Sequence, residues 1–215
     1  MHLVMFDIDG TLVDSHGFDA QLYAQTIHNV LGIEVDSSWS RYTNVTDSGI
    51  LDEVLDELGF SGDRSEVELL VKREFIRRTQ RYVAQHSGAI REIAGARALI
   101  ELLSSKDSVV LAIATGGWRE TAVLKLRAIG IDSDRIPMAT ASDATNRSVI
   151  MQLAESRSMN SRAALKKTYF GDGDWDQRAS AQLNYAFIAI GSRVDHHTAF
   201  ADLSDHAAIL AQLGV

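Results

Sequence analysis

The feature that most constrains the fold of this chain is a set of five short runs of apolar and β-branched residues. Their hydrophobicity is nearly continuous and does not alternate with polar residues, which is typical of strands covered on both faces. The runs are Leu3–Ile8, Val109–Ala114, Ile136–Ala141, Thr168–Gly171 and Tyr185–Ile190. Helical segments separate the last four, among them Trp118–Ile129 and Asn146–Glu155. This order of strands and helices predicts a doubly wound α/β fold around a parallel, Rossmann-like sheet.

About a hundred residues lie between the first and second runs, and they carry no strand signal. The segment Phe18–Leu31 has the pattern of a helix. Thr46 is a suitable N-cap for a second helix. Ser65, with Glu68 three residues later, matches a capping box that would begin a third helix over Glu66–Gln85.

A helical block inserted after the first strand is expected to form a second, smaller domain. We place this helical cap over residues 15–87, and the α/β core over residues 1–14 and 88–215. No internal repeat or proline-rich linker marks any other boundary, and Pro137 is the one proline in the chain.

Composition narrows the possible functions. Hydrophobic residues make up 46% of the 215 residues and charged residues 23%, as expected for a globular protein. The net charge of −8 disfavours nucleic acid and anionic membranes as partners. The chain has no cysteine, no signal-peptide pattern at its N-terminus and no apolar run near the roughly 18 residues of a membrane span. We therefore expect a cytoplasmic protein, either a monomer or a homodimer.

The first apolar run ends in two closely spaced acids, Asp7 and Asp9, which are followed by Gly10. Ligands bind at the carboxyl ends of the strands in open α/β sheets. Two acids this close repel each other, a conflict that a magnesium ion resolves for one of them while the other holds a proton for transfer. Asp and Gly are also common in ordinary turns at strand ends, so the pair alone leaves both interpretations open.

Two further strand ends carry polar groups. The fourth run is followed by the acids Asp172, Asp174 and Asp176, which are hard oxygen ligands suited to magnesium. The second run ends in Thr115-Gly116-Gly117 before a helix, where exposed backbone N–H groups and a hydroxyl can bind phosphate. Taken together, the three strand ends predict a magnesium-dependent phosphate site.

These segments resemble the motifs of the haloacid dehalogenase superfamily, in particular its phosphoglycolate-phosphatase-like members with a helical cap. Asp7-Ile8-Asp9-Gly10-Thr11 matches the first motif throughout, and Thr115 is similar to the Ser/Thr of the second motif. The segment Gly171–Asp176 resembles the acidic fourth motif. The matches follow the expected order from residue 6 to residue 176, so the resemblance covers most of the chain.

The resemblance implies a phosphatase that acts through an aspartyl-phosphate. Asp7 would be the nucleophile, and Asp9 would protonate the leaving oxygen and then activate water. Mg²⁺ would bind the Asp7 carboxylate, the Asp9 carbonyl and Asp172. Asp176 would support the metal from outside its direct ligands, and Asp174 is an alternative for that place.

The phosphoryl group would be held by Thr115 and Gly116 together with the cation of the third motif. That cation is normally a lysine, which this chain lacks at the expected place. Arg147 is the best substitute, because a guanidinium is a permanent cation that can grip phosphate. Lys166 and Lys167 lie in the turn before the fourth-motif strand and are expected to be solvated.

Several other activities use related folds. Dehalogenation would leave Asp9 and the acidic cluster without a role, and phosphonate cleavage would need a Schiff-base lysine where the cap offers Lys72 alone. A signalling receiver domain carries its acid pair and its phosphoacceptor on different strands, and a non-catalytic binding module would be expected to lose Asp7 or Asp9. A sugar phosphomutase uses the same motifs and stays open as an alternative. The expected substrate is a small phosphorylated metabolite.

Overall fold

The fold is built on a six-stranded parallel sheet in the order β5-β4-β1-β6-β7-β8. We describe it from a computed structural model, for residues 1–15, 17–160 and 163–215. The strands are β1 (His2–Phe6), β4 (Val109–Ala114), β5 (Met138–Ala139), β6 (Lys166–Gly171), β7 (Ala186–Ile190) and β8 (Ala199–Phe200). All five predicted strands and the doubly wound α/β fold are confirmed. The two-residue strand β8 is an edge strand that the apolar runs of the sequence did not predict.

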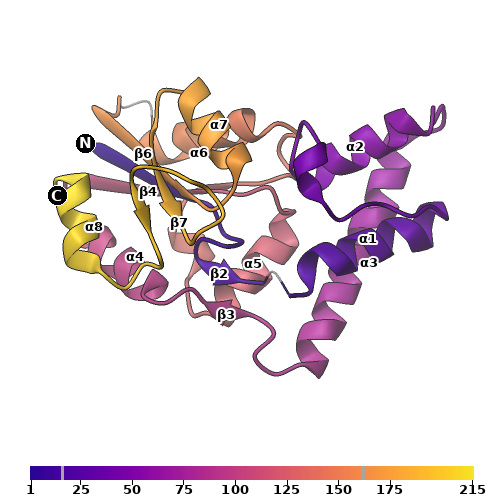
Figure 1. The fold of residues 1–215 in the computed structure, drawn as a ribbon, viewed down its shortest axis with the longest axis horizontal. Coiled ribbons are helices and arrows are strands. Elements are labelled where there is room, and N and C mark those ends of the chain that lie inside the picture. Colours follow the sequence, from indigo (N-terminus) through magenta and orange to yellow (C-terminus); the bar gives the residue numbers. More distant parts are fainter. Residues whose placement is uncertain (16, 161–162) are drawn as a thin grey trace.

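Helices cover both faces of this sheet (Figure 1). They are α4 (Ala96–Ser104), α5 (Arg119–Ala128), α6 (Arg147–Met159), α7 (Asp174–Gln182) and α8 (His206–Leu213), with the short helix η2 at Ser133–Arg135. Successive side chains of β1 enter opposite layers: Leu3 and Met5 pack in one apolar cluster with α6 and α7, and Val4 and Phe6 in another with α4, α5 and α8. Burial on both faces explains why these strands read as unbroken apolar runs.

The segment inserted after β1 forms a helical group at one end of the molecule, away from both termini (Figure 1). It contains α1 (Asp19–Leu31), η1 (Trp39–Arg41), α2 (Asp47–Glu57) and α3 (Arg64–Gln85). These helices share an apolar cluster that also takes in Trp118 and Ala141 from beyond the insert. The two connections to the sheet lie side by side, because β2 (Val13–Asp14) pairs with β3 (Arg91–Glu92).

Of the two N-caps predicted for helices of the insert, the structure confirms one and contradicts the other. Thr46 caps α2 as predicted, since its hydroxyl accepts a hydrogen bond from the Gly49 N–H at 2.9 Å. The predicted capping box at Ser65 is wrong. Asp63 caps α3 by accepting from the N–H groups of Ser65 and Glu66, so this helix begins at Arg64. An acid two residues earlier reaches the first free N–H groups and leaves Ser65 inside the helix.

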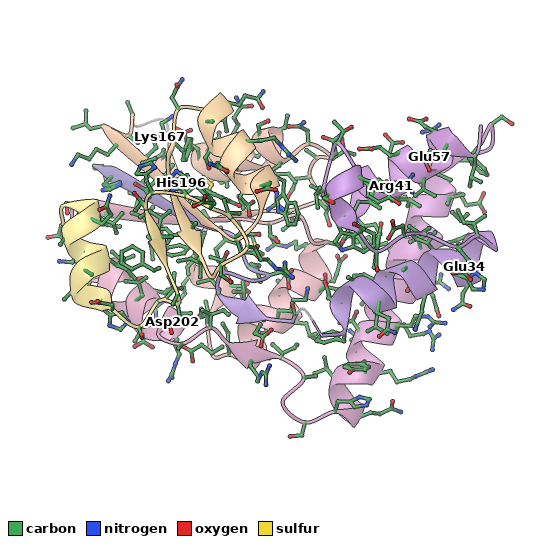
Figure 2. All side chains as sticks on the ribbon, viewed as in Figure 1. Glu34, Arg41, Glu57, Lys167, His196 and Asp202 are labelled. Atoms are coloured by element: carbon green, nitrogen blue, oxygen red, sulfur yellow. The ribbon has the colours of Figure 1, made fainter. Side chains whose placement is uncertain are left out.

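The outer surface of the insert is lined with paired charges. Arg41 and Glu57, for example, form an exposed ion pair of 2.5 Å (Figure 2). Among the described residues, no helix combines the length and the apolar character needed to cross a membrane.

Candidate active site

The three polar strand ends come together at one edge of the sheet. Asp7, Thr115 and Asp172 each stand one residue beyond the end of β1, β4 and β6. Their strands are neighbours in register, with Phe6 opposite Ile113 on one side and Phe170 on the other. The order of strands reverses at β1, which is where open α/β sheets place their ligand crevice.

Three acids form a compact buried cluster at this edge. Oxygens of Asp7, Asp172 and Asp176 lie within 4.8 Å of one another, and all three side chains are buried. Asp174, the alternative to Asp176, is exposed on the first turn of α7 and lies outside the cluster. Gly171 makes room for Asp176, because a Cβ at position 171 would come within 2.6 Å of that side chain.

The cluster carries the repulsion expected of packed carboxylates. Burial raises the pKa of Asp7 to about 6, with Arg147 opposing the shift and the charges of Asp172 and Asp9 adding to it. Burial is also the main cause that raises the pKa of Asp176. A divalent cation would relieve this cost, and carboxylate oxygens at such spacing are the hard donors that magnesium prefers. The residues present therefore fit this ion.

Arg147 lies against the acid cluster. Its Nη1 is 3.1 Å from Asp7 and 3.3 Å from Asp176, and its Nη2 donates to the carbonyl of Val45 at 3.2 Å. Gly116 makes this approach possible, since a Cβ there would lie 2.7 Å from Nη2. Burial would lower the pKa of Arg147, but the two acids outweigh it and raise the pKa well above its ordinary value. The cation predicted from sequence is thus placed beside Asp7.

The other lysines considered from sequence lie elsewhere. Lys166 and Lys167 begin β6, at the opposite end of that strand from Asp172, and Lys167 pairs with Glu155 at 2.5 Å. Lys72 bonds the hydroxyl of Ser142 at 2.9 Å. None of the three lines the cavity described below.

Asp9 contacts a lysine that sequence reasoning missed. The ammonium of Lys125 is 2.7 Å from Asp9 and 2.9 Å from Asp19 at the start of α1, and the hydroxyl of Ser15 also donates to Asp9. Lys125 is 1% exposed. The signal was present, because this lysine falls on the apolar stripe of α5 between Ala122 and Ile129.

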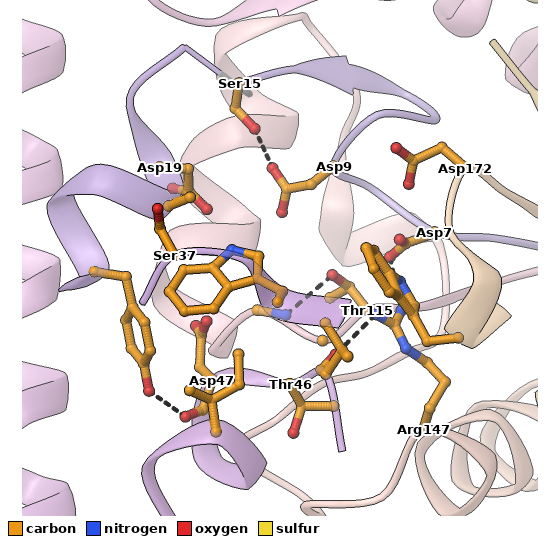
Figure 3. Close-up of a pocket in the computed structure, with 18 of the residues that line it drawn as sticks. Asp7, Asp9, Ser15, Asp19, Ser37, Thr46, Asp47, Thr115, Arg147 and Asp172 are labelled. Carbon is orange, nitrogen blue, oxygen red and sulfur yellow. Dashed lines mark hydrogen bonds and ion pairs between the residues drawn. The ribbon is translucent and has the colours of Figure 1, made fainter. Parts of the chain in front are cut away.

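A cavity of about 200 Å³ opens above the acids. Its floor includes Asp7, Asp9, Thr115, Gly116 and Arg147. Its roof comes from the insert and includes Asp19, Tyr23, Ser37, Trp39 and Asp47, and Trp175 and Arg193 add to the wall. Arg193, also missed from sequence, pairs with Asp172 at 3.2 Å. Figure 3 shows Asp7, Asp9 and Asp172 facing this space.

The chain is thus a doubly wound α/β protein whose central strand delivers paired aspartates into a roofed cavity. The family model of the haloacid dehalogenase-like hydrolases matches residues 4–190. The chain therefore belongs to the haloacid dehalogenase-like hydrolase family, as its motifs indicated, and it is an enzyme of the hydrolase class.

Solved structures show the same fold at low sequence identity. A hydrolase from Pseudomonas syringae is 21% identical over 99% of both chains, with a TM-score of 0.77. A beta-phosphoglucomutase from Clostridium difficile is 14% identical over 99% of this chain and 96% of that one, with a TM-score of 0.70. A predicted phosphoglycolate phosphatase from Haemophilus somnus is 16% identical over 96% of each chain, with a TM-score of 0.65. No curated protein matches the chain.

Proposed function

We propose that this protein is a magnesium-dependent phosphatase that hydrolyses a small phosphorylated metabolite through a phosphorylated Asp7. One observation carries the proposal: the Asp7 carboxyl stands at the end of the central strand, between the acid Asp172 and the cation Arg147, and lines a roofed cavity. That arrangement suits a nucleophile which must approach a phosphorus atom with several negative oxygens around it.

The Asp7 and Asp172 carboxylates and the Asp9 backbone carbonyl would hold Mg²⁺, with Asp176 close by. When bound, the ion would offset negative charge on the phosphate oxygens. Asp7 attacks phosphorus, and the new bond forms as the ester P–O bond breaks. Asp9 gives its proton to the leaving oxygen. Ionised Asp9 then takes a proton from the water that attacks the phosphorylated aspartate, which releases phosphate and restores Asp7.

The remaining residues hold the reacting groups. Thr115 and the backbone at Gly116 bind the transferred phosphoryl group together with Arg147, which also orients Asp7. Lys125 orients the Asp9 carboxyl from behind the cavity wall. The insert over 15–87 acts as a cap domain on the core of 1–14 and 88–215, and its closure excludes water. A roofed cavity of about 200 Å³ suits a small metabolite.

The direct test is a screen of phosphate esters with and without Mg²⁺, led by a generic aryl phosphate. We expect metal-dependent hydrolysis by the wild type and none by Asp7→Asn. The matched control is Asp174→Asn, which removes a carboxyl of the same kind from an exposed position outside the cluster. Undiminished hydrolysis by Asp7→Asn would contradict the assigned nucleophile.

Sugar phosphate isomerisation uses the same phosphorylated aspartate and is the alternative. The product formed distinguishes isomerisation from hydrolysis. A mutase would convert sugar phosphates into isomers with little free phosphate, whereas our proposal expects free phosphate in proportion to substrate consumed.

A further inference from the structure

The roof of the cavity holds an acid, Asp47, that the proposed chemistry does not use. It is the first residue of α2, and its backbone N–H donates to the carbonyl of Gly116 at 2.7 Å. The Trp118 N–H donates to Asp47 Oδ2 at 2.8 Å, and the Tyr23 hydroxyl donates to the Asp47 carbonyl. Tyr23 and Gly116 thus fix the backbone of Asp47, and Trp118 holds one oxygen of its carboxyl.

The other acids around the cavity have cationic partners within the protein. Asp7 and Asp176 face Arg147, and Asp172 faces Arg193. Lys125 serves both Asp9 and Asp19.

Asp47 differs from them. Among the described residues it has no ion pair, and its second carboxyl oxygen has no hydrogen-bond partner. Burial raises the pKa of this carboxyl to about 8, and the nearby charge of Asp19 adds to the shift. Apart from the Trp118 N–H on one oxygen, this carboxyl has no hydrogen-bond donor and no ion-pair partner among the described residues.

Asp47 lies where a bound substrate could supply the missing donor to its second carboxyl oxygen. In the view of Figure 3, Asp172 and Arg147 lie on one side of the cavity, Asp19 and Asp47 lie on the other, and Asp9 lies between them. A phosphoryl group bound at Asp7 directs its leaving oxygen toward Asp9, so the alcohol part of the ester extends toward Asp47. Tyr23 and Trp39 add aromatic walls at that end.

We propose that Asp47 is the centre of a leaving-group subsite that accepts phosphate monoesters whose alcohol part carries a hydroxyl or ammonium donor, and that rejects those carrying a carboxylate. This inference rests on the proposed phosphatase function and narrows its substrate class. A donor group satisfies the free carboxyl oxygen, whereas a carboxylate would meet the negative charge of Asp19, and that of Asp47 once it is ionised, with no free cation nearby among the described residues.

Three esters with the same two-carbon skeleton test the subsite: 2-hydroxyethyl phosphate, 2-aminoethyl phosphate and phosphoglycolate. We expect the wild type to show a kcat/KM at least tenfold higher for the better of the first two than for phosphoglycolate. The assays are run at about pH 9, where a carboxyl with a pKa of about 8 is mostly ionised. There the Asp47→Asn variant keeps an acceptor for the Trp118 N–H but removes the charge, and it should reduce this ratio of kcat/KM values at least threefold. Asp56→Asn, an exposed acid on the same helix, should leave the ratio unchanged. The three compounds are also ranked as competitive inhibitors of aryl phosphate hydrolysis, so that the order is obtained whether or not they turn over.

Two results would overturn the subsite while leaving the phosphatase intact. One is equal or better use of phosphoglycolate by the wild type. The other is a loss in Asp47→Asn that is the same for all three esters, as a purely structural contact between α2 and Trp118 would give. Failure of the wild type to hydrolyse aryl phosphate with Mg²⁺ would instead overturn the proposed function, and the subsite with it.

Discussion

At the scale of single residues, the site is organised by charges that are paired inside the protein. Lys125 is the clearest case, because a fully buried ammonium holds Asp9 on the floor of the cavity and Asp19 on its roof. Burial alone would lower the pKa of Lys125, yet Asp19 and Asp9 outweigh it and raise the pKa. The raised pKa keeps this lysine charged at neutral pH.

Removing this cation should be costly. In Lys125→Met the two acids lose their shared partner, and we expect the free energy of unfolding to fall by roughly 3 kcal/mol. Urea unfolding at neutral pH measures the change. The control is Lys72→Met, which breaks a partly exposed pair with Glu120 and should cost less than about 1 kcal/mol. Equal losses in the two variants would contradict the role given to Lys125.

Asp47 should make stability depend on pH. The pKa of its carboxyl is about 8 in the folded protein, against about 4 in an unfolded chain. The folded state therefore binds more protons between these values, so the contribution of Asp47 to stability falls as the pH rises from about 4 to about 8. The difference in unfolding free energy between Asp47→Asn and the wild type should shift by roughly 3–4 kcal/mol in favour of the variant from about pH 5 to about pH 8. A difference that stays constant over this range would refute the raised pKa.

At the scale of elements, the sequence predicted strands better than helix ends. Unbroken apolar runs identify strands that are covered on both faces, so all five core strands were found. Helix starts depend on which side chain reaches the first free N–H groups, and at α3 the neighbouring Asp63 and Ser65 both suit that place. Val149 shows the same limit, because it is an apolar residue of the predicted helix Asn146–Glu155 and yet is 43% exposed. The helix turns Ile150, Met151 and Ala154 inward instead, a rotation that only packing decides.

The cap of α3 can be checked by substitution. Asp63→Ala should lower the free energy of unfolding by about 1 kcal/mol, because two backbone N–H groups lose their acceptor. Ser65→Ala, inside the first turn, should change it by less than about 0.5 kcal/mol. Chemical denaturation measures the free energy of unfolding of both variants. A larger loss in Ser65→Ala than in Asp63→Ala would show that Ser65 is the cap after all.

The residues of the site also divide into those that the sequence could predict and those that it could not. Asp7, Asp9, Thr115 and Asp172 follow strand ends, so sheet topology brings them together and the sequence could predict them. Tertiary packing alone brings Asp19, Asp47 and Arg193 to the cavity, and it also brings Lys125 against Asp9 behind the cavity wall. Lys125 and Asp19, for example, are 106 positions apart in the chain. No local spacing in the sequence predicts that contact, although a lysine among the apolar positions of a helix indicates a buried, paired cation.

At the scale of the whole molecule, the insert and the sheet are joined directly above the acids. The Ser48 hydroxyl donates to the carbonyl of Ala141 at 3.0 Å, and the Thr46 hydroxyl donates to that of Thr145 at 2.6 Å. Trp118 is fully buried in the cluster formed by the inserted helices. The insert therefore covers the cavity in this structure.

Metal binding should therefore stabilise the molecule as a unit. Mg²⁺ in large excess over its dissociation constant should raise the melting temperature of the wild type by several degrees, since each kcal/mol of ligand binding is worth about 2–4 °C for a chain of this size. Thermal unfolding with and without Mg²⁺ measures the shift. It should disappear in Asp172→Asn and persist in Asp174→Asn. A shift of equal size in both variants would place the ion elsewhere.

The central claim is that Asp7 becomes phosphorylated. The most direct measurement uses the Asp9→Asn variant with Mg²⁺ and an aryl phosphate, whose good leaving group needs no general acid. Loss of the Asp9 base should stall the second step, so that acid quenching and peptide mass analysis find one phosphoryl group on the peptide that carries Asp7. We expect this adduct in Asp9→Asn and its absence when Asp7→Asn is combined with Asp9→Asn. Turnover with no phosphorylated peptide, or a phosphoryl group on a residue other than Asp7, would contradict it.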